Sequence, residues 1–170
     1  ARAREIITQQ SLMAFYQPKV QLQTGELVGF EALMRWHSPS HGVQLPNTIL
    51  EAFNDYQLAT QIGEQMQHLV MGDIARWLSD GLQVKPVSIN AAPVEFLRDD
   101  YAERLLDKLA RYQIPAALVE VEVTEHVLNE RGSAFVARAL TTLKQHGVRI
   151  ALDDFGTGHS SLANLRDYPV

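Results

Sequence analysis

The sequence contains no cysteine in its 170 residues. Disulfide frameworks, thiolate zinc sites, iron–sulfur clusters and cysteine nucleophiles are therefore excluded. A metal ion bound by this chain would have to use oxygen or imidazole ligands. The six histidines show no pair at a metal-ligand spacing such as His-Glu-x-x-His, so oxygen is the expected ligand atom.

Long apolar runs are also missing. No stretch approaches the roughly 18 residues that a membrane span requires, and the opening residues lack the apolar region of a signal peptide. We therefore expect a cytoplasmic segment without membrane contact, even if an upstream domain anchors the protein. The pattern of residues 1–12 predicts a short amphipathic helix, which we expect to be a linker from a preceding domain.

Positive charge is in deficit, with 15 Lys and Arg against 20 Asp and Glu and a formal net charge of -5. This balance argues against a protein that binds a nucleic-acid polymer through its phosphates. A small anionic ligand is compatible with it if a metal ion supplies local positive charge. The hydrophobic fraction of 46% is that of a folded globular domain.

Apolar runs of strand length alternate with longer helical patterns, which predicts an α/β fold built around a parallel sheet. The expected strands cover residues 15–20, 27–36, 87–91, 118–124 and 149–155. The expected helices cover residues 47–82, as two helices broken near Gly63 or Gly72, and residues 94–112 and 134–146. Only six residues separate the first two strands, too few for a crossover, so these strands should pair as an antiparallel hairpin.

Oxygen-bearing side chains recur late in these strands, where a parallel sheet is otherwise apolar. Side-chain alternation places Glu31 on the same face as Arg35. The recurring residues are Glu31, Asn90, Glu122, Asp153 and the adjacent Asp154. Active sites of barrels and doubly wound sheets lie at the carboxyl ends of the strands, and hard oxygen ligands suit Mg²⁺ or Mn²⁺.

Two adjacent aspartates suggest a second ion, with Asp153 bridging the two and Asp154 binding one, as in sites that hydrolyse phosphodiesters. A simpler interpretation also exists. Glu31 would then form a salt bridge with Arg35, Asn90 would make an Asx turn, and the carboxylates would be solvated strand ends. Each residue taken alone favours that interpretation, whereas the five together favour a metal site.

Four motifs stand in order along the chain: FEALMRW, VSINAAPVEF, VEVTE and DDFGTGHSSL, with YQPKV upstream. Together they resemble the EAL-domain family of cyclic di-GMP phosphodiesterases over residues 13–170. The resemblance implies a TIM-like (β/α) barrel with one antiparallel strand. It also implies cyclic di-GMP as the ligand, linear pGpG as the product and a homodimer as the assembly.

The resemblance assigns roles to individual residues. Glu31, Asn90, Glu122 and Asp153 would bind the first metal ion, and Asp153 with Asp154 the second, which makes Glu31, Asp153 and Asp154 the catalytic set. Leu33 and Arg35 would contact the dinucleotide, Arg35 through a phosphate, with Gln17 nearby. Glu125 would anchor the loop of residues 154–161, which links metal binding to the dimer interface. Lys19 and His159 depart mildly from the family pattern.

The length adds a further expectation. A TIM-type barrel has eight strands and about 250 residues, so this chain is expected to hold about five strands, or the first two thirds of the domain. The later Lys, Glu and Gln of the family site would follow Val170. We therefore also keep a noncatalytic cyclic di-GMP receptor and an inactive fragment as alternatives, and we expect an isolated chain to be poorly stable or to associate through its open sheet edge.

Overall fold

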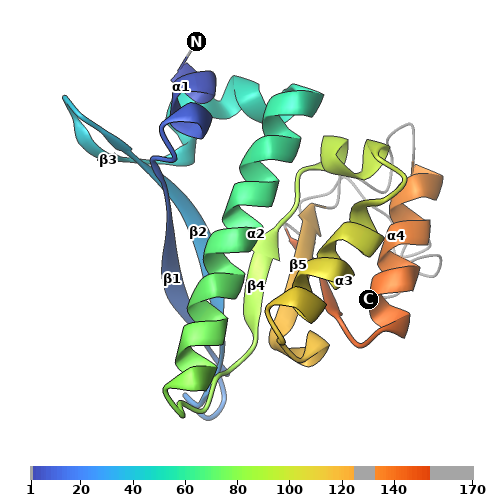
Figure 1. Cartoon of the computed structure of the whole chain (residues 1–170). Coiled ribbons are helices and arrows are strands. Elements are labelled where there is room, and N and C mark those ends of the chain that lie inside the picture. Colours follow the sequence, from blue (N-terminus) through green and yellow to red (C-terminus); the bar gives the residue numbers. More distant parts are fainter. Residues whose placement is uncertain (1, 125–132, 154–170) are drawn as a thin grey trace.

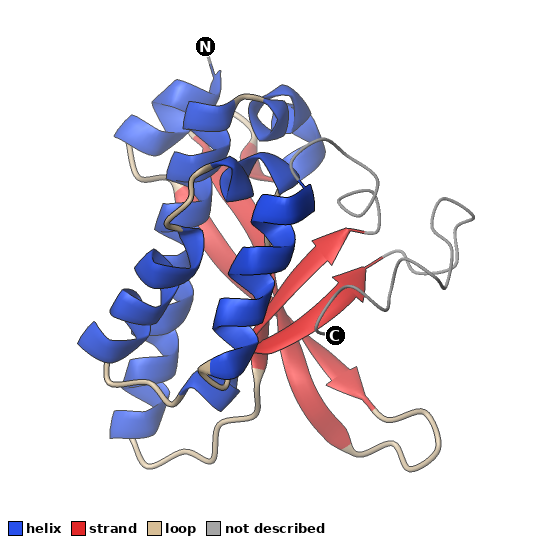
Figure 2. Cartoon of the chain, turned by 90° about the vertical axis from the view of Figure 1, so that its right-hand side faces the viewer, coloured by secondary structure: helices blue, strands red, loops and turns tan. Residues whose placement is uncertain are grey.

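The computed structural model describes residues 2–124 and 133–153, which form one mixed sheet with helices packed against one side (Figures 1 and 2). The strands are β1 Leu12–Val20, β2 Leu27–Ser38, β3 Gly42–Gln44, β4 Val87–Asn90, β5 Val119–Thr124 and β6 Arg149–Asp153. The helices are α1 Arg2–Thr8, α2 Tyr56–Ser79, α3 Tyr101–Arg111 and α4 Ser133–Gln145. Short 3₁₀ helices cover Pro46–Asn54 (η1), Pro93–Leu97 (η2) and Ala116–Leu118 (η3).

The sheet has the strand order β1-β2-β4-β5-β6, and β3 pairs with β2 beside this path. Strands β2, β4, β5 and β6 are parallel to one another, whereas β1 is antiparallel to β2. Each parallel neighbour is reached through a helical crossover, as the geometry of parallel strands demands. The predicted hairpin and the predicted α/β class are thus confirmed, and the order is that of a partial (β/α) barrel with one antiparallel strand.

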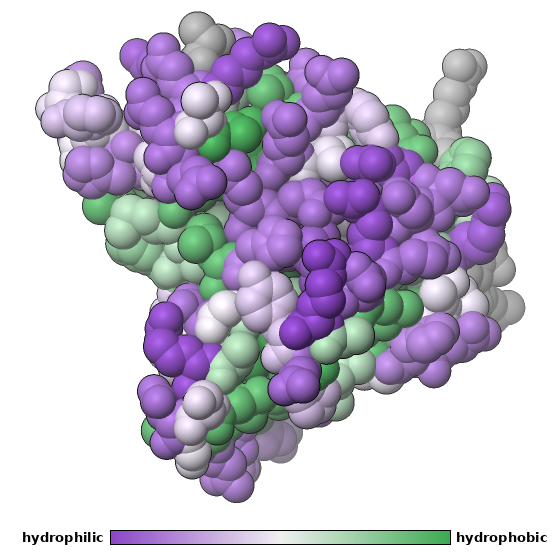
Figure 3. Space-filling view, in the orientation of Figure 1, coloured by the Kyte–Doolittle hydropathy of each residue, from purple (hydrophilic) through white to green (hydrophobic). Residues whose placement is uncertain are grey.

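The two faces of the sheet differ in chemistry. Val87, Val119 and Val121 are among the fully buried strand residues that pack against α2, α3 and α4, on what we call the helix face. The strand residues that alternate with those of the helix face point to the other side of the sheet, and many of them are polar. We call this side the polar face. Its members are Gln17, Lys19, Glu31, Arg35, Ser88, Asn90, Glu120 and Glu122. The side of the molecule covered by helices is mostly hydrophilic on its surface, with hydrophobic residues in narrow strips (Figure 3).

The helical boundaries correct two predictions. The break expected near Gly63 or Gly72 is wrong, because α2 runs without interruption from Tyr56 to Ser79. The chain instead changes direction at Asp55, whose side chain caps α2 by accepting a hydrogen bond from Leu58 N at 3.0 Å.

The single helix expected over residues 94–112 is also wrong, because two separate helices cover this range. The short helix η2 ends at Leu97, the backbone is extended at Arg98, and α3 begins at Tyr101. Strand β3 was not predicted, since three residues are too few to give a periodic signal.

A buried carboxyl group fixes the segment that follows β4. Glu95 accepts a hydrogen bond from Ala92 N at 2.6 Å and lies against Gly63 of α2. Only 6% of Glu95 is exposed, and this burial raises its pKa to about 8 even though the hydrogen bond from Ala92 acts in the opposite direction. Glu95 therefore joins η2, which begins three residues after Asn90, to the middle of α2.

Helices α2 and α3 are joined by a second buried polar contact. The ammonium of Lys108, 2% exposed as a residue, forms an ion pair with Glu64 Oε2 at 2.5 Å and donates to Gln67 Oε1 at 3.0 Å. Arg104 pairs with the other oxygen of Glu64 at 2.9 Å. The carboxylate of Glu64 on α2 thus forms ion pairs with two cationic side chains from one face of α3.

Candidate functional site

Strands β2, β4 and β5 bring three of the predicted ligands together on the polar face. Asn90 is the last residue of β4, but Glu31 lies in the first half of β2 and not late in it as expected, because β2 continues to Ser38 to pair with β3. Asn90 Nδ2 donates a hydrogen bond to Glu31 Oε1 at 3.2 Å. Asn90 is also the register partner of Glu122 on the adjacent parallel strand. The three side chains therefore come from three consecutive strands of the sheet, although 59 residues separate Glu31 from Asn90.

Neighbouring register positions extend this arrangement in both directions. Gln17 on β1 is directly opposite Glu31, so the antiparallel strand adds the predicted substrate-binding glutamine beside the first ligand. On the other side, Thr124 is the register partner of Asp153, the last residue of β6. The side chain of Asp153 and all of Asp154 and Glu125 lie outside what the structure describes.

A cavity of about 410 Å³ opens beside these strand ends. Arg35, Asn90 and Glu122 contribute to its polar side, and Leu33 also lines it. Its apolar side comes from α2 and the segment before it, through Leu50, Phe53, Ile62 and Met66. A largely apolar cavity with a few converging polar groups is the usual form of a small-molecule site.

Arg35 is held at the edge of this cavity by neighbours on the hairpin. Its Nη1 atom donates to the carbonyl oxygen of Met34 at 2.7 Å, and its guanidinium lies 5.8 Å from the centre of the Phe15 ring. Among the ion pairs of the described residues none joins Arg35 to Glu31. The simpler interpretation of Glu31 as a salt-bridge partner of Arg35 is therefore wrong.

The ligand atoms fit a hard divalent cation in their chemistry. The amide nitrogen of Asn90 donates to Glu31, which leaves the amide oxygen to accept from another group or to bind a cation. Within residues 2–124 and 133–153, no three acidic or histidine side chains form a group able to hold an ion by themselves. Two carboxylates and one amide oxygen are thus the donors that the described residues offer, and Asp153 and Asp154 stay predicted additions.

Lys19 is a residue of this site that sequence reasoning missed. From β1 its ammonium reaches across β2, donating to Ser88 Oγ at 2.7 Å on β4 and to Glu120 Oε1 at 3.4 Å on β5. It also forms an ion pair and hydrogen bond with Glu122 Oε1. Burial by itself lowers the pKa of Lys19, but the hydrogen bond and charge of Glu122, followed by those of Glu120, raise it above its ordinary value.

A signal for Lys19 was present in the sequence. It follows Gln17 at a spacing of two, which puts both residues on one face of the first strand. Its partners could not be read in the same way, because they depend on the register of three further strands.

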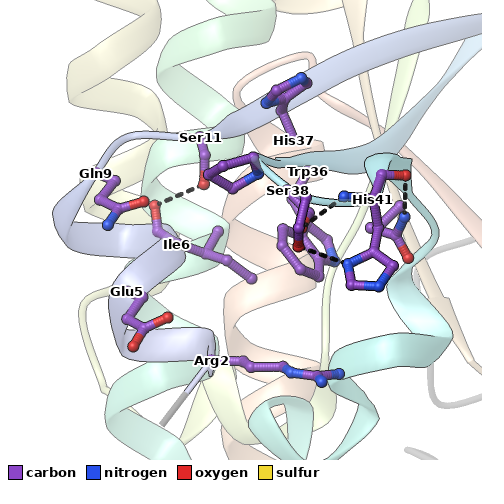
Figure 4. Close-up of a pocket in the computed structure, with 12 residues that line it drawn as sticks. Arg2, Glu5, Ile6, Gln9, Ser11, Trp36, His37, Ser38 and His41 are labelled. Atoms are coloured by element: carbon purple, nitrogen blue, oxygen red, sulfur yellow. Dashed lines mark hydrogen bonds between the residues drawn. The ribbon is translucent and has the colours of Figure 1, made fainter.

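A second cavity, of about 350 Å³, lies between α1 and the β2–β3 hairpin and shares no lining residue with the first (Figure 4). Arg2, Glu5, His37 and His41 line it. Its polar contacts are local, such as that between His41 Nδ1 and Ser40 Oγ at 2.6 Å.

Among the described helices, none is long and apolar enough to cross a membrane.

Parallel strands joined by helical crossovers, preceded by one antiparallel strand, define the class of this protein as a partial (β/α)-barrel domain. The EAL domain family model matches residues 1–170, so the chain belongs to the EAL domain family. The resemblance inferred from the four motifs is confirmed.

Individual relatives agree with this assignment. The chain is 30% identical over 168 residues to the cyclic di-GMP phosphodiesterase PA2567 of Pseudomonas aeruginosa, covering 99% of this chain and 28% of that protein. It is 31% identical over 167 residues to the bifunctional diguanylate cyclase/cyclic di-GMP phosphodiesterase MucR of the same organism, covering 98% of this chain and 24% of MucR. The chain spans about a quarter of the length of the curated relatives it matches.

A solved structure of the PaMucR phosphodiesterase in complex with c-di-GMP superimposes with a TM-score of 0.87 at 31% identity. The match covers 98% of this chain and 67% of that one. The described strands and helices therefore have the fold of an EAL domain, and the predicted TIM-like architecture is confirmed.

Proposed function

We propose that this chain provides the metal ligands and part of the substrate site of a cyclic di-GMP phosphodiesterase that releases linear pGpG. One observation carries the proposal: Glu31, Asn90 and Glu122 lie together on one face of three adjacent strands, with Asn90 and Glu122 lining the same cavity as Arg35. The membership of the EAL family and the phosphodiesterase relatives support it.

The residues of the polar face have separate tasks in this proposal. Arg35 binds a phosphate of the dinucleotide, because a guanidinium donates well-directed hydrogen bonds to phosphate oxygens. The contacts of Arg35 with Met34 and Phe15 restrict its orientation before the ligand arrives. Leu33 contacts the ligand from the same strand, and Gln17 lies beside Glu31 to contact it from β1.

Glu31, Asn90, Glu122 and Asp153 would hold one Mg²⁺ or Mn²⁺ ion, and Asp153 with Asp154 a second. Bound divalent cations of this kind neutralise phosphate charge and activate water for in-line attack on a phosphodiester. The chain's own contribution is to place carboxylate and amide oxygens at one sheet edge. The hydrogen bond between Asn90 and Glu31 fixes the orientation of both side chains for this purpose.

Two further roles are proposed from the family resemblance alone. Glu125 would anchor the loop of residues 154–161, and that loop would connect metal binding to a homodimer interface. Sedimentation of the chain with and without Mg²⁺, compared with a Glu125→Gln variant, tests both roles. Metal-dependent dimerisation that is lost in the variant is the expected result, and a monomer under all conditions contradicts it.

Calorimetry of cyclic di-GMP binding, combined with chromatography of the nucleotide afterwards, tests the proposed function. We expect binding that requires Mg²⁺ or Mn²⁺ and that is lost in Glu31→Ala. Linear pGpG in the eluate supports hydrolysis, whereas binding without product supports a noncatalytic receptor or a chain that needs the later Lys, Glu and Gln of the family site. A chain that binds no cyclic di-GMP with either metal contradicts the proposal, and Glu26→Ala, a change in the hairpin turn away from the polar face, serves as the matched control.

A further inference from the structure

Lys19 connects three strands beneath the proposed metal site. It starts on β1, and its register partner on β2 is Gly29, a residue without a side chain. No β2 side chain at that position separates the ammonium from Ser88 on β4 and from Glu120 and Glu122 on β5. Ser88 in turn donates to Glu120 Oε1 at 2.7 Å, so the four side chains form one connected polar cluster.

The charges in this cluster need a cation. The side chain of Glu122 is 9% exposed and that of Glu120 is 22% exposed, and both lie within reach of a single ammonium. Two carboxylates held this close and this far from water repel each other unless a positive group lies between them. Lys19, whose side chain is 34% exposed, supplies that charge from β1, whereas both carboxylates belong to β5.

We infer that Lys19 is a positioning residue that acts as the resident counter-ion of the metal site: its ammonium holds Glu122 in the metal-free chain and leaves that carboxylate when a divalent cation binds. The inference rests on the proposed function in one respect, the role of Glu122 as a metal ligand. Metal loading is then an exchange of one cation for another. The affinity for the metal includes the cost of separating Lys19 from Glu122.

Removing the charge of Lys19 should therefore tighten metal binding while it destabilises the metal-free chain. Calorimetric titration of this 170-residue chain with Mn²⁺ alone tests this in Lys19→Met and Lys19→Gln. We expect a Kd about tenfold lower in both variants, the size of effect that one partly solvent-screened positive charge close to a divalent ion produces. We also expect lower melting temperatures without metal and larger increases on adding Mn²⁺.

Lys85→Met is the matched control, because it removes the same charge from a residue that lines a different cavity together with Trp77. It should leave the Kd for Mn²⁺ unchanged. If the unaltered chain binds Mn²⁺ and the Lys19 variants bind it no more tightly, the inference about Lys19 is overturned and the metal site stands. If the unaltered chain binds no Mn²⁺, or if Glu122→Gln binds it equally well, the metal site itself is overturned, and the inference falls with it.

A measurement on the unaltered chain covers the case in which the Lys19 variants fail to fold. Reductive methylation followed by peptide mass spectrometry reports how accessible each lysine ammonium is, with Lys85 as the internal standard. We expect Mg²⁺ to increase the rate at Lys19 several-fold and to leave Lys85 unaffected. A rate at Lys19 that Mg²⁺ does not change overturns the exchange.

Discussion

Glu95 occupies the space that a side chain at Gly63 would need. A Cβ atom built at Gly63 would come within 1.8 Å of Glu95 Oε1, well inside any real contact. The carboxylate of η2 and the bare backbone of α2 are therefore complementary in shape. This contact connects the segment after Asn90 to the longest helix of the structure, and it makes the glycine a packing requirement and not a helix breaker.

Gly63→Ala should destabilise the chain. The added methyl group forces Glu95 out of its place, and Glu95 then loses the hydrogen bond from Ala92 N. We expect a loss of about 1–2 kcal/mol in the free energy of unfolding, typical of an overpacked site. Urea denaturation followed by circular dichroism measures it.

Gly72→Ala in the same helix is the matched control. Apart from the backbone of α2 itself, no atom of the described residues lies within 4 Å of a Cβ built at Gly72, so the better helix propensity of alanine should raise stability by up to about 1 kcal/mol. A second control, Glu95→Ala combined with Gly63→Ala, should cost less than the sum of the two single changes. Equal effects of the alanines at positions 63 and 72 would contradict the packing argument.

Glu95 should also make stability depend on pH. Its pKa is about 8 in the folded chain, above the value of a carboxyl group in an unfolded chain, so the folded state binds more protons between these two values. Stability from this group is therefore complete below the pKa of the unfolded chain, decreases as the pH rises from that value, and is lost once the pH passes about 8. Glu95→Gln should remove this slope and raise the free energy of unfolding at pH 8, relative to the unaltered chain, by up to about 5 kcal/mol, since one pKa unit corresponds to about 1.4 kcal/mol. Denaturation midpoints from pH 5 to pH 9 test this, and parallel curves for the two chains would disprove it.

Glu64 should matter more than the other acidic residues of the α2–α3 contact. Glu64→Gln leaves the buried ammonium of Lys108 without a carboxylate, and breaking one partner of such a pair costs about 3 kcal/mol. Asp107→Asn, which breaks an exposed pair with Arg111, should have little effect. Denaturant unfolding of both variants makes the comparison, and similar losses in the two would show that the Lys108 contact is unimportant.

Arg35 and Glu31 should separate ligand binding from metal binding. Glu31→Ala removes a proposed metal ligand and should weaken both Mn²⁺ binding and cyclic di-GMP binding. Arg35→Ala removes only a proposed phosphate contact, so Mn²⁺ affinity should persist while cyclic di-GMP affinity falls at least about tenfold. Calorimetry with each ligand measures this split. Loss of Mn²⁺ binding in Arg35→Ala would assign that residue to the metal site instead.

Much of the sheet could be predicted from local patterns. Side-chain alternation placed Glu31 with Arg35 and separated Glu122 from Val121 and Val123, and the structure has these residues on the expected faces. The short connection between the first two strands was enough to predict their antiparallel pairing. Such features depend on neighbouring residues only, which is why one sequence suffices for them.

Features that depend on distant residues were not predictable. Gly63 was expected to break a helix, whereas it makes room for Glu95, which belongs to another element. Lys19 was seen only as a departure from the family pattern, since its partners lie on strands whose register the sequence does not specify. The side chain of Asp153 and the residues Asp154 and Glu125 lie outside the described part of the chain, so their roles stay predictions.

The β1–β2 hairpin has a consequence for the order in which the domain folds. Its two strands are joined by a short turn, so closing them costs little chain entropy, whereas every other pairing along the sheet path waits for a helical crossover to form. Hairpins form within microseconds, much faster than pairings between residues distant in sequence. Gln17 and Glu31 should thus be aligned early, giving the later strands a template on which Asn90 and Glu122 are added one strand at a time.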